Sequence, residues 1–327
     1  MKALVSTAPF GLTDNTPIKL LDDAGIEFKV NPYGRKMSEE ELGEAIADFD
    51  YLIAGTEKIS EKVLANAQKL KLISRVGIGL DSVDLVAARR KNIRVTYTPD
   101  APSPAVAELT IGLMLSLLRC IHISNDAMHH GHWQRIFGRR LSDSTIGVIG
   151  AGRIGSRVVE YLSGFGCQRI LVNDIDPSIE SSLPGHVKMA SKESIFREAD
   201  VITIHVPLTQ DTRGMVSEEE LNLVKKNAVL INTARGGIVN ERALRIALEN
   251  GTLFGAAIDT FETEPYSGPL CDLKECLLTS HMGSMSEDCR ARMEIEATQE
   301  VVRFVKGEAL SQEAPEAEYQ NQVFSKR

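Results

Sequence analysis

Arg235, Glu264 and His281 have complementary chemistry, and each follows a short apolar segment typical of a buried strand. An imidazole titrates near neutrality, so it can give or take a proton at a reacting oxygen in either direction of a reaction. A neighbouring carboxylate orients the ring and favours its protonated form, and a guanidinium can bind a substrate carboxylate. Because each residue alone could equally be a solvated loop residue, the prediction that all three are catalytic depends on the fold bringing them together.

The second half of the chain alternates strand-like and helix-like segments, which predicts a parallel sheet covered by helices. In a doubly wound sheet of order 3-2-1-4-5-6, ligands bind outside the carboxyl ends of the strands. The last three strands would therefore place Arg235, Glu264 and His281 beside one another. Six strands are expected, at 146–149, 170–172, 201–204, 228–231, 255–258 and 277–279.

A dinucleotide-binding pattern opens this half of the chain. An apolar run is followed by Gly150, Gly152 and Gly155, then by an apolar-periodic helix and a second apolar run that ends shortly before Asp174. The first glycine permits a tight turn, the second lets a pyrophosphate approach the backbone, and the third lets the helix pack on the strand. The helix N-terminus would face the phosphates, and the carboxylate of Asp174 would accept ribose hydroxyls and repel a 2′-phosphate. The pattern therefore predicts NAD rather than NADP as the cofactor.

The first hundred residues show the same alternation without a dinucleotide pattern. The expected fold class is α/β, with two doubly wound parallel-sheet, Rossmann-like domains and a cleft between them. The expected strands lie at 3–6, 27–30, 51–54, 72–75 and 94–96, and helices are expected at 17–24, 39–47 and 61–67.

The segment Arg75-Val76-Gly77-Ile78-Gly79 is the main chemical feature of this first half. It follows a buried type of strand and precedes a helix, so its N–H groups could bind a carboxylate. A plain glycine turn is the alternative.

Three prolines between residues 98 and 104 separate the two halves, and one long helix is expected from Ser103 to about residue 130. The polar arm that follows carries the single tryptophan, Trp133, and suggests a dimer contact. Three histidines at 129, 130 and 132 have no acidic or cysteine partner, so solvated side chains are expected there and no metal site.

Composition narrows the class of protein. The net charge of −8 and the pI near 5.5 argue against a nucleic-acid or anionic-membrane partner. The five cysteines show no metal-like pairing, and the N-terminus lacks the features of a signal peptide, so a reducing, cytoplasmic location is expected.

Six motifs together resemble the D-isomer-specific 2-hydroxyacid dehydrogenase family and are most similar to its phosphoglycerate dehydrogenase branch. They are RVGIGLDSVDL, AVAELTIGLML, GVIGAGRIG, NTARGGIVNERAL, AAIDTFETEP and TSHMGS. The resemblance implies that His281 is the proton donor and acceptor, Glu264 its partner and Arg235 a substrate-binding residue. It also implies substrate contacts from the turn at 75–79, and cofactor contacts from Gly150, Gly152, Arg153, Ile154, Gly155, Asp174, Val206, Pro207, Thr212, Thr233, Ala234, Asp259, Gly283 and Ser284.

The resemblance further implies a substrate domain of residues 1–98 plus 287–327, an NAD-binding domain of residues 99–286, and a homodimer formed through the latter. One departure is that the phosphoglycerate branch commonly has an arginine for the substrate phosphate near Gly55 and Thr56, where this chain has none. Arg75 and Arg135 remain as candidates for that contact. The chain also ends soon after the last expected helix, so no appended regulatory domain is expected.

The expected activity is reversible NAD-dependent oxidation of a D-2-hydroxy acid to a 2-oxo acid, with D-3-phosphoglycerate, glycerate, glyoxylate or hydroxypyruvate as candidate substrates. Two alternatives stay open. One is a non-catalytic NAD(H)-sensing protein of the corepressor type, and the other is a dehydrogenase of the formate or phosphite type.

Overall fold

A computed structural model describes residues 1–325 of the chain. The chain forms two compact units, one of residues Met1–Pro102 and Ser284–Arg327 and the other of residues Ser103–Gly283. Each unit is built on its own parallel β-sheet, which confirms the expected α/β fold with two parallel-sheet, Rossmann-like domains.

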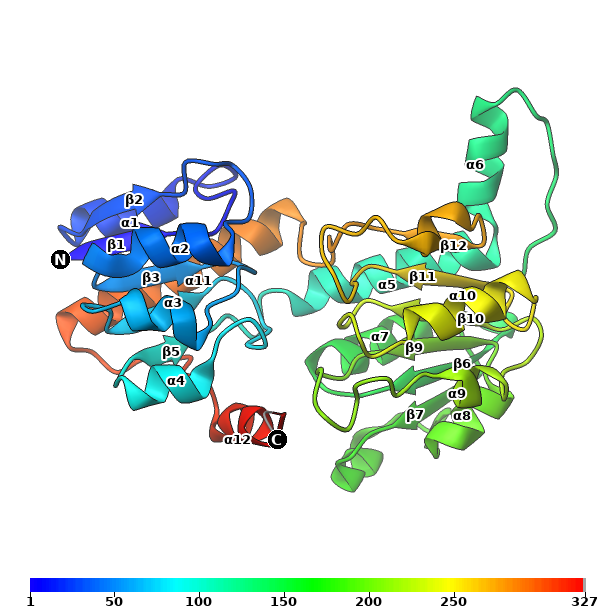
Figure 1. Cartoon of the computed structure of the whole chain (residues 1–327). Coiled ribbons are helices and arrows are strands. Elements are labelled where there is room, and N and C mark those ends of the chain that lie inside the picture. The colour runs from blue at the N-terminus through cyan, green and yellow to red at the C-terminus, as the bar shows by residue number, and fades with distance from the viewer. Residues whose placement is uncertain (326–327) are drawn as a thin grey trace. The chain divides into compact units, whose positions relative to one another are not determined.

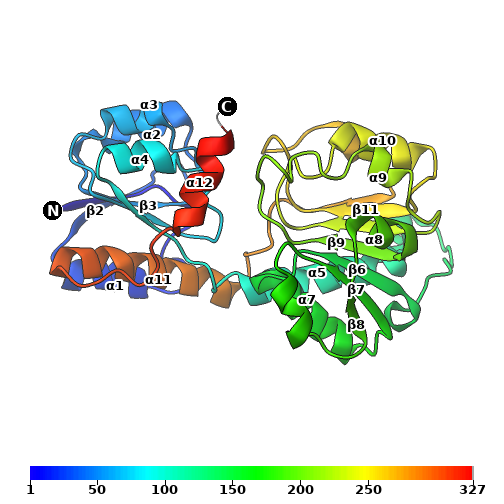
Figure 2. The same cartoon turned by 90° about the horizontal axis from the view of Figure 1, so that it is seen from below.

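The first unit contains a five-stranded parallel sheet of order β2-β1-β3-β4-β5. Figure 2 shows α2, α3 and α4 on one face of this sheet and α1 and α11 on the other. The strands are β1 (Lys2–Val5), β2 (Glu27–Val30), β3 (Tyr51–Ala54), β4 (Leu72–Arg75) and β5 (Arg94–Thr96). The helices are α1 (Thr16–Asp23), α2 (Glu39–Ala45), η1 (Ile46–Asp48), α3 (Glu61–Asn66), α4 (Leu85–Arg90), α11 (Glu287–Lys306) and α12 (Glu316–Ser325).

Local sequence explains where these helices begin. Pro17 occupies the first turn of α1, where its missing N–H removes no helical hydrogen bond. Ser38 caps α2 through a capping box with Glu41, and Asp84 caps α4 by accepting from the N–H of Ala87 at 2.9 Å. The central strands β3 and β4 are buried along their whole length, as expected for a sheet covered on both faces.

The second unit contains a seven-stranded parallel sheet of order β12-β11-β10-β9-β6-β7-β8 (Figure 1). Its strands are β6 (Thr145–Ile149), β7 (Arg169–Asn173), β8 (Val187–Met189), β9 (Val201–Ile204), β10 (Val229–Asn232), β11 (Gly255–Ile258) and β12 (Cys276–Leu278). Its helices are α5 (Ser103–Leu118), α6 (Ile121–His129), η2 (Leu141–Asp143), α7 (Arg153–Gly164), η3 (Pro177–Ser182), α8 (Lys192–Glu198), α9 (Glu218–Leu221), α10 (Glu241–Glu249) and η4 (Pro269–Asp272).

The expectation of six strands was wrong by one. The missed strand, β8, has three residues and only Val187 is buried, so its sequence lacks the apolar run that marks the other strands. Because β8 takes the outer edge beside β7, β9 pairs with β6 in the middle of the sheet. The loops that carry Arg235, Glu264 and His281 therefore follow β10, β11 and β12, the fifth to seventh strands of this sheet.

The single long helix expected after the proline-rich segment was also wrong. The chain forms α5 and α6, which are bent by 66° at a break where Cys120 has a left-handed φ of 51°. Nine residues of α5 are buried but none of α6, so α5 packs in the core while α6 projects from the domain (Figure 1). Within the described residues, no single helix is long and apolar enough to cross a membrane. Only α5 and α6 taken together, across their bend, reach the length and apolar composition of a membrane span.

Candidate active site

His281 and Glu264 are in direct contact in the second unit. Nδ1 of His281 lies 3.0 Å from Oε1 and 2.9 Å from Oε2 of Glu264. The two side chains are 33% and 25% exposed, so both remain accessible to a small ligand. Because Glu264 occupies Nδ1, the other ring nitrogen, Nε2, is the one available for proton transfer.

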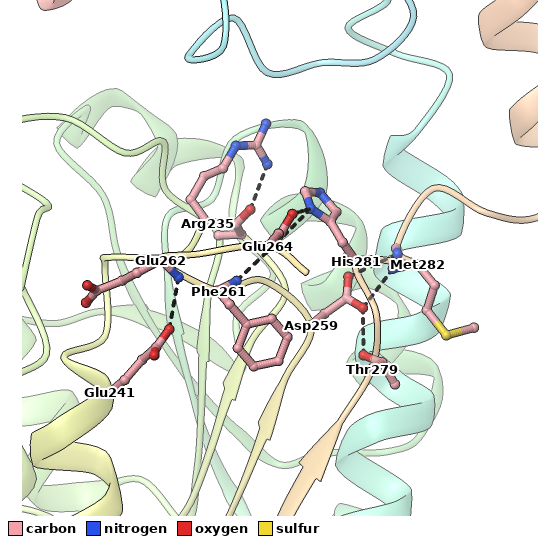
Figure 3. Close-up of polar contacts among 11 residues, drawn as sticks. Arg235, Glu241, Asp259, Phe261, Glu262, Glu264, Thr279, His281 and Met282 are labelled. Carbon is pink, nitrogen blue, oxygen red and sulfur yellow. Dashed lines mark hydrogen bonds and ion pairs between the residues drawn. The ribbon is translucent and has the colours of Figure 1, made fainter. Parts of the chain in front are cut away.

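Arg235 lies in the loop after the neighbouring strand β10, and Figure 3 shows its side chain on the same side of the sheet edge as Glu264 and His281. Its guanidinium donates to the carbonyl of Ala234 at 2.7 Å. The loop itself is shaped by Asn232, whose amide donates to the carbonyl of Arg235 at 2.9 Å and accepts from the N–H of Ala234 at 3.1 Å. Arg235 is thus half-buried on a loop with a fixed backbone.

Gly236 allows the Arg235 loop and the Glu264 loop to touch. A Cβ atom at Gly236 would lie only 2.0 Å from the carbonyl carbon of Phe261, which real side chains do not tolerate. The Glu264 loop is held in turn by its own carboxylate, which accepts from the N–H of Phe261 at 3.1 Å, and by stacking of Phe261 on Tyr266 at 4.2 Å between centroids. These contacts hold the loops that carry Arg235 and Glu264 close together.

Asp259 holds the loop that carries His281. Its carboxylate accepts from the hydroxyl of Thr279 at 2.6 Å and from the N–H groups of Met282 and Gly283 at 2.9 and 3.0 Å (Figure 3). Its carbonyl accepts from the N–H of His281 at 2.8 Å, and His281 adopts a left-handed φ of 50°. The sequence pointed to a cofactor contact for Asp259, which stays a prediction. The role of Asp259 in holding the His281 loop was not predicted, because its hydrogen-bond partners are at least twenty positions away in sequence.

The glycine turn after β6 has the close packing expected of a dinucleotide site. A Cβ at Gly155 would lie 1.9 Å from the carbonyl oxygen of Gly150, while one at Gly152 would meet nothing within 4 Å. α7 begins at Arg153, so its first N–H groups lie directly at this turn. Asp174 accepts from the N–H of Ala151 at 2.7 Å, which ties the acid at the end of β7 to the turn. These residues fit the pyrophosphate and ribose of NAD.

The remaining residues predicted to contact the cofactor lie mostly after the carboxyl ends of β9 and β10 and in the first turn of α7. The hydroxyl of Thr212 donates to the carbonyl of Pro207 at 2.6 Å, which closes the loop that also carries Val206. The hydroxyl of buried Thr233 lies 2.9 Å from that of Thr110, and Ile154 lies in the first turn of α7. Ser284 falls in the first unit.

His205, at the end of β9, was not singled out from the sequence. It is half-buried beside the glycine turn, where a Cβ at Gly150 would lie 2.5 Å from its carbonyl oxygen. Its Nε2 lies 2.9 Å from the hydroxyl of Thr203, and burial lowers its pKa to about 3. His205 is therefore neutral at physiological pH.

The predicted substrate residues are on different units. Arg75 to Gly79 belong to the first unit, where the N–H of Gly77 donates to the hydroxyl of Thr98 at 2.7 Å. Arg75 is buried and its guanidinium donates to the carbonyl of Val76.

Arg135 is exposed on the segment after α6. Because Nε2 of His122 on α6 lies 3.2 Å from the carbonyl of Lys274, α6 sits at the amino end of β12, opposite the edge that carries His281. The structure therefore does not bring Arg135 to His281 within the domain. In the part of the chain that is described, no group of three or more histidine, cysteine or acidic side chains could hold a metal ion.

Comparison with known proteins identifies the family. Residues 111–283 match the domain family described as "D-isomer specific 2-hydroxyacid dehydrogenase, NAD binding domain". The chain belongs to the D-isomer-specific 2-hydroxyacid dehydrogenases. It is 33% identical to a hydroxypyruvate reductase of Thermotoga maritima over 274 residues, which cover 82% of this chain and 88% of that protein.

Two further members of the family extend this comparison. The chain is 38% identical to a D-3-phosphoglycerate dehydrogenase of Methanocaldococcus jannaschii over 296 residues, 89% of this chain, but it spans only about half of that protein, 56%. A crystal structure of D-lactate dehydrogenase from Aquifex aeolicus complexed with NAD and lactic acid superposes with a TM-score of 0.81 at 27% identity, covering 94% of this chain and 96% of that one.

These comparisons confirm the resemblance noted from the sequence motifs. At the level of the family, they also confirm the expected class of NAD-dependent dehydrogenase and NAD as its cofactor.

Proposed function

We propose that the chain catalyses the reversible oxidation of a D-2-hydroxy acid to a 2-oxo acid with NAD. The observation that carries the proposal is the contact between His281 and Glu264 at 2.9 Å, on the same edge of the NAD-binding sheet as Arg235. A proton carrier, a carboxylate that orients it and a carboxylate-binding guanidinium are the groups that this reaction requires.

Each residue has a distinct task in this proposal. NAD, when bound, accepts or supplies the hydride at the substrate carbon. Nε2 of His281 takes the hydroxyl proton during oxidation and returns it to the carbonyl oxygen during reduction. Glu264 keeps Nδ1 hydrogen-bonded and stabilises the imidazolium, and Arg235 binds the carboxylate of the acid. We also propose that the N–H groups of the turn at 75–79, in the first unit, bind the substrate, because N–H groups in such a turn can hold a carboxylate.

We propose a small 2-hydroxy acid, or in the reductive direction its 2-oxo acid, as the substrate. The candidates are D-3-phosphoglycerate and glycerate for oxidation, and glyoxylate and hydroxypyruvate for reduction. The names of the relatives from M. jannaschii and T. maritima support this class. The segment at 54–57, which begins at the last residue of β3, consists of Ala, Gly, Thr and Glu and therefore adds no cation for a phosphate.

The test is substitution of the proton carrier. His281→Ala should lower kcat by roughly 10² to 10⁴, as loss of a general acid and base does, while NADH binding persists. Glu264→Gln should lower kcat less, because a neutral amide still orients the ring. Both variants are measured by NADH absorbance for turnover and by fluorescence titration for NADH affinity. Near-normal turnover of His281→Ala would remove the assigned role.

The assembly we propose is a homodimer formed through the NAD-binding domain, in the cytoplasm. Trp133 and Phe137 are 81% and 101% exposed on the segment after α6, and large exposed aromatics are typical of protein interfaces. All five cysteines are free thiols, which suits a reducing compartment. Sedimentation equilibrium measures the mass, and a monomer at micromolar concentration would contradict the dimer.

A further inference from the structure

The segment after α11 returns to the five-stranded sheet of the first unit. α11 ends at Gly307, which has a left-handed φ of 70° and turns the chain. The backbone N–H of Tyr97 then donates to the carbonyl of Gln312 at 3.1 Å, and the N–H of Ala314 donates to the carbonyl of Val95 at 2.9 Å. These two bonds place an antiparallel bridge along β5, so residues 311–314 extend the sheet at its edge.

Ionic contacts fix the segment in this position. The buried carboxylate of Glu300 on α11 accepts from the N–H groups of Ser311 and Gln312 at 2.9 and 3.3 Å. Arg94 on β5 pairs with Glu313 at 2.7 Å. Glu300 on α11 and Arg94 on β5 thus set the register of the bridge.

The following helix, α12, packs on α4. Arg89 forms two hydrogen bonds to the carboxylate of Glu316, at 3.0 and 2.7 Å, and its guanidinium lies 3.5 Å from the ring centroid of Tyr319. Paired bonds and a stacked ring fix a helix better than a lone surface ion pair does. The next turn of α12 therefore lies against the loop that leads into α4.

Gln322 on that turn makes three hydrogen bonds to this loop. Its Nε2 donates to the carbonyls of Val83 and Leu80 at 2.7 and 3.3 Å, and its Oε1 accepts from the N–H of Leu85 at 2.8 Å. The side chains of Leu80 and Val83 are almost fully buried, so the loop that Gln322 binds is packed into the core. Gln322 is 237 to 242 positions away in sequence from the groups it contacts.

The loop at 80–85 directly follows the turn at 75–79. At its middle residue the turn is tied to Thr98, whose hydroxyl accepts from the N–H of Gly77 at 2.7 Å. On its C-terminal side Gln322 binds the carbonyl of Leu80, the residue after Gly79. The direction in which the N–H groups of the turn point depends on both attachments.

We propose that Gln322 is a positioning residue for substrate binding, which sets the geometry of the turn at 75–79 through the loop at 80–85. This inference rests on the proposed function, in which that turn binds the carboxylate of the acid. Ile59 anchors the same loop independently, donating to the carbonyl of Ser82 at 2.8 Å and accepting from the N–H of Asp84 at 2.9 Å. Loss of Gln322 should therefore misplace the turn without unfolding the unit.

The test uses Gln322→Glu, which keeps the size of the side chain but removes both donated hydrogen bonds. Steady-state kinetics on the full chain should show a KM for the 2-oxo acid raised by roughly fivefold, the scale of a lost pair of hydrogen bonds, with kcat and the Kd of NADH within about twofold. Gln320→Ala is the matched control, because Gln320 is exposed two positions earlier on the same helix. It should leave all three constants unchanged.

A charge swap checks that docking of α12 carries the effect. Arg89→Glu alone should raise KM as Gln322→Glu does, and the pair Arg89→Glu with Glu316→Arg should restore it. An unchanged KM in Gln322→Glu would overturn the inference while leaving the proposed function intact. A loss of NADH affinity as large as the rise in KM would do the same. Absence of turnover in the unmodified chain would overturn the proposed function and this inference with it.

Discussion

At the scale of single residues, the candidate site depends on side chains that are far apart in sequence and bound to one another in the fold. The residue types of Arg235, Glu264 and His281 were readable from the sequence, because each follows a strand. The sequence did not show that Nδ1 of His281 faces Glu264 or that Asp259 holds the loop at 279–283. Hydrogen bonds of this kind depend on backbone positions that no local pattern encodes.

Asp174 carries the first residue-scale prediction. Its carboxylate accepts from the N–H of Ala151 in the glycine turn, so it lies where the adenosine ribose of NAD is expected. Asp174→Ala should reduce the preference for NADH over NADPH by roughly tenfold, the scale of one hydrogen bond to a charged group. The ratio of kcat/KM for the two cofactors measures it, and unchanged discrimination would show that another group selects the cofactor.

His205 carries the second residue-scale prediction. Burial lowers its pKa from 6.5 to about 3, so the folded chain resists the proton that the unfolded chain accepts. The contribution of neutral His205 to stability is therefore complete above pH 6.5 and is lost as the pH falls from 6.5 towards 3. Between pH 6 and pH 5 this one group should lower the free energy of unfolding by roughly 1 kcal/mol.

His205→Gln provides the comparison, because an amide of similar reach does not titrate. Urea unfolding of both proteins at pH 7.5, 6 and 5 isolates the contribution of this residue, since the other histidines are common to both. Equal losses of stability in the two proteins would show that His205 is protonated in the folded state.

At the scale of elements, most strands were predicted correctly, but β8 and the break between α5 and α6 were not. β3, β4 and β5 lie where their apolar runs placed them. β8 was missed because two of its three residues are not buried. The break between α5 and α6 was missed because the apolar pattern continues through Ile121 and gives no sign that Cys120 turns left-handed.

The glycine turn gives a prediction at this scale. Gly155→Ala would place a methyl group against the carbonyl of Gly150, so the first turn of α7 must move away from β6. We expect a loss of more than about 2 kcal/mol in the free energy of unfolding and a loss of NADH binding. Gly164→Ala on the same helix is the control, because a Cβ there meets nothing within 4 Å.

The control variant should be neutral or more stable by ~0.5–1 kcal/mol, because alanine favours a helix over glycine. Thermal unfolding and fluorescence titration with NADH compare the two variants directly. Full NADH affinity in Gly155→Ala would mean that the close approach of α7 to β6 is not needed for binding.

At the scale of the whole molecule, the chain consists of two parallel-sheet units, and only one of them has the dinucleotide turn and the contact between His281 and Glu264. Composition and motifs were sufficient to predict this class of fold and the family. The specific acid was not predictable, because substrate selection depends on side chains that follow the strand ends, and these vary while the fold stays the same.

The most direct test of the account is NADH absorbance during incubation of the unmodified chain with glyoxylate, hydroxypyruvate, pyruvate and 3-phosphohydroxypyruvate. The account predicts that at least one of these 2-oxo acids is reduced, with NADH consumed in equal amount and the matching 2-hydroxy acid formed, as the D isomer where the product is chiral. NADH that binds to the chain but is consumed with none of them would contradict the account and favour a nucleotide-sensing protein.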